Sequence, residues 1–94
     1  MAIDDQILRK RLRFRSWHRG TREMDLILGR FADRHLEAMD RGQLDRYGGF
    51  LENSDPDIYN WLTGREAPPS MIGTDLWRQI QASFADLVGR ESKS

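Results

Sequence analysis

Residues 55–62 read Asp-Pro-Asp-Ile-Tyr-Asn-Trp-Leu, and this stretch contains the clearest helix start in the chain. Asp55 can cap the free backbone amides, and Pro56 suits the first helical position. Asp57 adds negative charge at the positive end of the helix dipole. The apolar residues that follow have helical rather than alternating spacing. We therefore predict a short helix here that ends before Gly64.

The same helical period of apolar residues continues outward in both directions, and capping signals divide it into further helices. Asp4 or Asp5 can cap a first helix, Thr21 a second, and Asp40 with Gln43 forms a capping-box start for a third. The expected helices cover about residues 5–17, 22–39, 41–51, 55–62 and 74–88, with a connector at 64–73 and a frayed tail at 89–94.

Glycines and the lack of strand patterns complete the expected fold. Gly20 is expected to end the first helix, because glycine adopts positive φ without a Cβ clash. Gly48 and Gly49 weaken the third helix and read as a flexible or close-packed turn, since no strand flanks them as in a dinucleotide-binding loop. We predict an all-α fold, a single bundle of about five helices over residues 1–94, with Phe31 and Trp61 in one core.

The composition excludes several classes of function. Ninety-four residues suffice for one small domain with little room for an internal ligand cavity. The chain has no cysteine and only two histidines, which argues against disulfides and metal clusters. The sequence shows no membrane-spanning apolar run and none of the short motifs of common enzymes, and we expect no secretory leader from its opening residues. We expect it in a bacterial cytoplasm, or in the mitochondrial matrix if it is a processed organellar form.

Charge is strongly polarised along the chain. Residues 9–22 read RKRLRFRSWHRGTR, with seven Lys or Arg and no acid, although the formal net charge is zero. Such polarity indicates a face for a particular partner. The basic run has three possible interpretations: a solvated helix face, a nucleic-acid surface or a protein-binding surface. The acids elsewhere and the lack of a recognition-helix pattern count against nucleic acid.

The candidate binding residues lie around the end of this basic run. Arg19 offers a planar fork of donors, and Gly20 permits close approach of another surface. Because Thr21 can cap the second helix, Glu23 is available to bind an arginine of a partner or of the chain itself. The predicted partner-binding residues are Arg11, Arg15, Arg19, Gly20, Glu23 and Asp25.

These residues form a known pattern. Arg19-Gly20-x-x-Glu23 resembles the RGxxE motif of the succinate dehydrogenase flavoprotein assembly factors, also called FAD assembly factors. The block at residues 55–62 resembles the second hallmark of that family, and similarity extends over nearly the whole chain. Supporting positions are Arg11-Leu12, Phe14, Ser16, Asp25, Leu28, Phe31-Ala32, His35-Leu36, Gln43-Leu44, Tyr47 and Leu51. The departures are Trp17-His18, where a more basic pair is common, and the Gly48-Gly49 pair.

The resemblance implies a function. Family members are small helical bundles that bind the flavoprotein subunit of succinate dehydrogenase, and in some bacteria that of fumarate reductase. They promote covalent attachment of FAD to a histidine of that subunit, whose own site performs the chemistry. The chain is then an assembly chaperone and not an enzyme. It is expected to be a monomer when free, with no stably bound cofactor, no nucleic acid and no membrane insertion.

Two rival functions remain open at this stage. One is a small basic-faced helical module that binds nucleic acid or has a regulatory role. The other is an enzyme, a flavinyl ligase acting at Glu23. The chain lacks a recognisable nucleophile–base pair, which argues against the ligase.

Overall fold

The computed structural model describes the backbone of residues 3–92 and the side chains of residues 3–89. Within these residues the chain forms five α-helices and no strand, so the predicted all-α class is confirmed. The helices are α1 (Asp5–Trp17), α2 (Arg22–His35), α3 (Arg41–Leu51), α4 (Asp55–Leu62) and α5 (Thr74–Ser92). Two short 3₁₀ helices, Leu36–Ala38 and Ser70–Ile72, lie in the connections.

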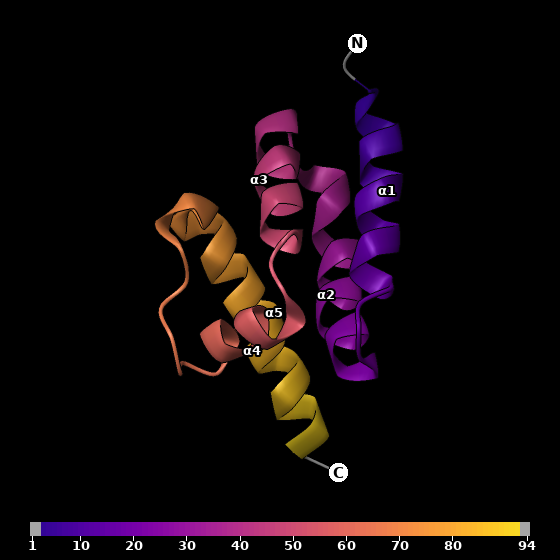
Figure 1. Ribbon diagram of the computed structural model, residues 1–94. Helices are drawn as coiled ribbons and strands as arrows, with labels where there is room; N and C mark the ends of the chain where they lie inside the picture. Colours follow the sequence, from indigo (N-terminus) through magenta and orange to yellow (C-terminus); the bar gives the residue numbers. More distant parts are fainter. Residues whose placement is uncertain (1–2, 93–94) are drawn as a thin grey trace.

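Three helices lie side by side and two cross beside them. Helices α1, α2 and α3 run in alternating directions, and in the view of Figure 1 the short α4 crosses the longer α5. Helix α2 is central because it packs against both α1 and α5. Phe31 is fully buried and Trp61 is 8% exposed, which confirms the predicted core positions. Other fully buried side chains include Leu12, Leu28, Leu36, Leu44 and Tyr47.

Local capping chemistry explains most helix starts. The side chains of Asp4, Thr21 and Asp40 accept backbone hydrogen bonds at the starts of α1, α2 and α3, as predicted. The predicted cap of α4 is wrong. Ser54 caps this helix, its Oγ accepting from the backbone amide of Asp57 at 3.2 Å, and residue 55 is the first helical residue. The Asp55 carboxylate is therefore available for other contacts.

The ends of α2 and α5 differ from the expected ends. Helix α2 stops at His35, yet Met39 remains buried because the following 3₁₀ turn returns it to the core. Helix α5 continues to Ser92, so the predicted frayed tail is wrong for residues 89–92. Residues 93–94 lie outside the described residues.

The glycine pair of α3 is a helix interior. Gly48 and Gly49 both lie within Arg41–Leu51, so their interpretation as a turn is wrong. A Cβ added at Gly48 would lie 3.4 Å from Cδ2 of Leu12, which shows how closely α1 approaches. Burial of Leu44, Tyr47, Phe50 and Leu51 on the same helix outweighs the low helix propensity of glycine.

Close packing between α1 and α2 gives a first testable prediction. Gly29 is buried in α2, and an added Cβ would lie 2.2 Å from Cδ2 of the Trp17 ring. We expect Gly29→Ala to lower the free energy of unfolding by about 1–3 kcal/mol through overpacking, despite the better helix propensity of alanine. Gly49→Ala is the control, because no atom lies within 4 Å of its added Cβ and it should be neutral or stabilising. Urea unfolding midpoints that move alike in both variants would contradict this packing.

Candidate functional site

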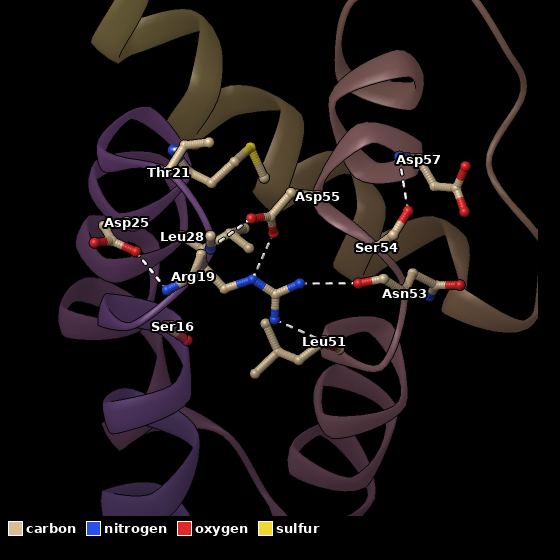
Figure 2. Close-up of polar contacts among 12 residues, drawn as sticks. Ser16, Arg19, Thr21, Asp25, Leu28, Leu51, Asn53, Ser54, Asp55 and Asp57 are labelled. Carbon is tan, nitrogen blue, oxygen red and sulfur yellow. Dashed lines mark hydrogen bonds and ion pairs between the residues drawn. The ribbon is translucent and has the colours of Figure 1, made fainter.

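The guanidinium of Arg19 connects the α1–α2 turn to the α3–α4 turn (Figure 2). Nε donates to Oδ1 of Asp55 at 2.8 Å, Nη1 to the carbonyl of Leu51 at 2.9 Å, and Nη2 to the carbonyl of Asn53 at 2.8 Å. The Arg19 side chain is 11% exposed and that of Asp55 is 15% exposed. Arg19 therefore uses its planar fork of donors inside the fold.

Carboxylates also hold the backbone of the α1–α2 turn. Oδ2 of Asp55 accepts from the backbone amide of Gly20 at 2.6 Å. Oδ1 of Asp25, in the first turn of α2, accepts from the backbone amide of Arg19. We call Arg19, Gly20, Asp25 and Asp55 the turn clamp. The turn clamp brings the RGxxE motif at residues 19–23 into contact with the block at residues 55–62.

Gly20 differs in backbone conformation from the sequence prediction. Among the described residues only Gly64 and Gly73 have positive φ, so the predicted left-handed conformation of Gly20 is wrong. A Cβ added at Gly20 would instead lie 2.9 Å from Oδ2 of Asp55. Because Gly20 has no side chain, the carboxylate of Asp55 can approach the backbone at this position.

This contact predicts the effect of Gly20→Ala. We expect a loss of about 1–2 kcal/mol in the free energy of unfolding, because the Asp55 carboxylate must move away from the amide that it accepts from. In an Asp55→Ala background the same change should have little further effect. Equal losses in both backgrounds, measured by urea unfolding, would exclude the contact as the cause.

Glu23 lies in the first turn of α2, beside the turn clamp but outside its hydrogen bonds. Its side chain is exposed and makes no hydrogen bond or ion pair with any residue in the described part of the chain. Arg19 is bound to Asp55, and none of the other arginine side chains within residues 3–89 binds Glu23. Glu23 therefore presents an exposed carboxylate that has no partner among the described side chains.

Arg11 and Arg15 differ from each other in their surroundings. Nη2 of Arg15 lies 3.1 Å from Oε1 of Glu52, and the two side chains are 38% and 74% exposed. Arg11 is exposed and forms no ion pair or hydrogen bond with the residues described. An exposed pair such as Arg15–Glu52 contributes little to stability. Contact of a partner with Arg11 and Arg15 stays a prediction.

Most cations of the basic run at residues 9–22 contact other parts of the chain. Arg9 donates to the carbonyls of Leu36 and Met39 at 3.0 and 2.8 Å. Nε of Arg13 lies 3.3 Å from Oδ1 of Asp33. Together with Arg15 and Arg19, four of the seven cations thus tie α1 to the rest of the bundle. The exposed cations of the run that make no such contact with described residues are Lys10, Arg11 and Arg22. Three such cations are few for a nucleic-acid surface.

The ionisable side chains inside the bundle have structural contacts. Ser16 Oγ and Tyr47 Oη lie 2.7 Å apart in the core, and burial raises the pKa of Tyr47 above its usual value. His35 stacks on Phe31, and desolvation together with the charge of Arg34 lowers its pKa. The described side chains, those of residues 3–89, include no group of three His, Cys, Asp or Glu that could hold a metal ion. None of the helices formed by residues 3–92 is both long and apolar enough to cross a membrane.

Comparison with known proteins identifies the family. The family described as flavinator of succinate dehydrogenase matches residues 10–84. The chain is 36% identical over 74 residues to succinate dehydrogenase assembly factor 2, mitochondrial, of Dictyostelium discoideum, covering 79% of this chain and 52% of that protein. It is 36% identical over 72 residues to FAD assembly factor SdhE of Acetobacter pasteurianus, covering 77% of this chain and 66% of that protein.

A third relative extends the match along the chain. Succinate dehydrogenase assembly factor 2, mitochondrial, of Aspergillus flavus is 43% identical over 95 residues, covering 92% of this chain and 32% of that protein. The chain thus spans between 32% and 66% of the length of these three relatives. The match to residues 10–84 includes the turn clamp, Glu23 and all of α4. The chain belongs to the flavinator of succinate dehydrogenase family.

Proposed function

We propose that this protein binds the flavoprotein subunit of succinate dehydrogenase, its client, and promotes covalent attachment of FAD to that subunit. Family membership supports this function, and the names of the relatives describe assembly factors. The observation that carries the proposal is the geometry of the motif. The hydrogen bonds of Arg19, Asp25 and Asp55 hold the turn, and the exposed carboxylate of Glu23 lies beside it.

The turn clamp and Glu23 have separate roles in this proposal. Arg19, Asp25 and Asp55 fix the turn before the client arrives, so little conformational entropy is lost on binding. Glu23 contacts the client directly, and Gly20, Arg11 and Arg15 add to the same interface. Binding orients the client so that its own histidine and flavin meet in reactive geometry, and such alignment can be worth several kcal/mol of barrier.

We propose that the protein acts as a chaperone and not as an enzyme, as a monomer in the compartment of its client and without bound FAD. The test is co-expression of the client with and without this chain, followed by in-gel fluorescence of covalent flavin. A chaperone should leave slow residual attachment in its absence and raise the yield several-fold in its presence. Equal yields would reject the function, and complete absence of covalent flavin without the chain would favour a ligase.

The flavoprotein subunit of fumarate reductase is a second proposed client. The same co-expression assay with that subunit checks it, with the succinate dehydrogenase subunit as the positive control. An increase in covalent flavin on both subunits is the expected result. An increase on one alone would restrict the chain to that client.

A further inference from the structure

Two shallow hollows beside the turn clamp share a wall formed by Glu23 and Tyr59. One has a volume of about 280 Å³ and is also lined by Thr21, Met24, Asp55 and Pro56. The other has a volume of about 240 Å³ and is also lined by Leu26, Ile27, Phe84, Leu87 and Val88. We call the two hollows together the Glu23 groove. It extends from Thr21, at the start of α2, to Leu87 and Val88 of α5, and Figure 1 shows where these helices lie.

The Glu23 groove combines apolar walls with a carboxylate that has no counterion among the side chains of residues 3–89. Tyr59 is 39% exposed and Val88 is 45% exposed, so large apolar surfaces face solvent. Among the side chains that the structure describes, no lysine, arginine or histidine lines either hollow. Asp55, the other acid, is already bound to Arg19. A partner that covers this surface must supply a cation, because covering an unpaired carboxylate is costly.

We propose that the Glu23 groove binds a segment of the client in which an arginine lies between apolar side chains. This inference rests on the proposed function. A guanidinium can donate two hydrogen bonds to Glu23 and lie against the ring of Tyr59, a combination that lysine cannot reproduce. The apolar neighbours of that arginine would enter the hollows on either side. Tyrosine and arginine are typical residues of strong interface contacts.

Photocrosslinking with the purified client tests the occupant. A photoreactive phenylalanine analogue is placed at Val88, at the rim of the groove, and in a control protein at Met71, which is 87% exposed and lines neither hollow. Position 88 should crosslink to one client peptide that contains an arginine, and position 71 should not. A peptide without arginine, or a crosslink to a second copy of this chain, would overturn the proposal.

A double-mutant cycle then tests the pairing. Glu23→Gln here and Arg→Gln at the crosslinked position of the client should each raise the Kd about tenfold or more, and the two together should raise it little further. If the double change raised the Kd by the product of the two single effects, the two residues would act independently and the pairing would be overturned.

The two proposals can fail separately. Tyr59→Ser should weaken client binding about tenfold, while Met71→Ser should leave the Kd within about twofold. If the unmodified chain promotes flavin attachment and Tyr59→Ser binds the client normally, the groove proposal fails and the function stands. If the unmodified chain neither binds the client nor promotes attachment, both fail.

Discussion

Replacing Asp55 with alanine should lower the free energy of unfolding by about 3 kcal/mol. The substitution removes the acceptor of Arg19 Nε and of the Gly20 amide, and leaves a guanidinium that is only 11% exposed without its counterion. For a domain of this size the expected fall in Tm is on the order of 12–24 °C. Thermal unfolding followed by circular dichroism measures it.

Matched variants separate the turn clamp from a general loss of charge. Arg15→Ala removes an arginine from an exposed pair with Glu52 and should cost under about 1 kcal/mol. Arg19→Ala combined with Asp55→Ala should be less destabilising than the sum of the two single changes, because the second change removes the unpaired group. If Asp55→Ala and Arg15→Ala unfolded alike, the turn clamp would not be a major source of stability.

The fold was predictable where the determining contacts are local. Caps at Asp4, Thr21 and Asp40 act within three residues of their own helix starts, so the chain order alone identifies them. Ser54 and Asp55 are both good caps by residue type, so the local sequence does not show that Ser54 caps α4 while Asp55 binds Arg19. The end of α5 was missed because one glycine costs only about 1 kcal/mol in a helix.

The candidate site was predictable in its residues but not in their connections. The RGxxE spacing identifies Arg19 and Glu23 as candidate residues, but it predicts that both lie on one partner-binding surface. The pair Arg19–Asp55 spans 36 positions in a chain with fifteen acids, so the sequence holds no signal that selects this partner. Because the Arg19–Asp55 pair forms, the arginine of the RGxxE motif is largely buried while the glutamate, Glu23, is exposed.

Glu23→Gln should leave the protein folded and greatly reduce covalent flavin on the co-expressed client. The change keeps the size and hydrogen-bonding capacity of the side chain but removes the charge. If Glu23 only favoured the dipole of α2, the variant would lose about 0.5–1 kcal/mol of stability and retain its activity. We expect at least about a tenfold loss of client affinity, as for a central charged contact of an interface, and correspondingly weak in-gel flavin fluorescence.

Asp75→Asn is the control for this variant. Asp75 is an exposed acid in the first turn of α5, so its neutralisation weakens the dipole interaction of a helix start in the same way. Its client flavin should match that of the unmodified protein. Full flavin fluorescence of the client with Glu23→Gln, at matched expression, would show that Glu23 only stabilises the start of α2.

Reconstitution with purified components tests the central claim, that the chain promotes flavin attachment through Glu23 beside a preformed turn. The measurement is the initial rate of covalent flavin formation on the FAD-free flavoprotein subunit, with added FAD and increasing amounts of this chain. The account predicts a slow rate without the chain, a saturable increase with it, and little increase with the same concentrations of Glu23→Gln. An initial rate that is the same with and without the unmodified chain would contradict the account.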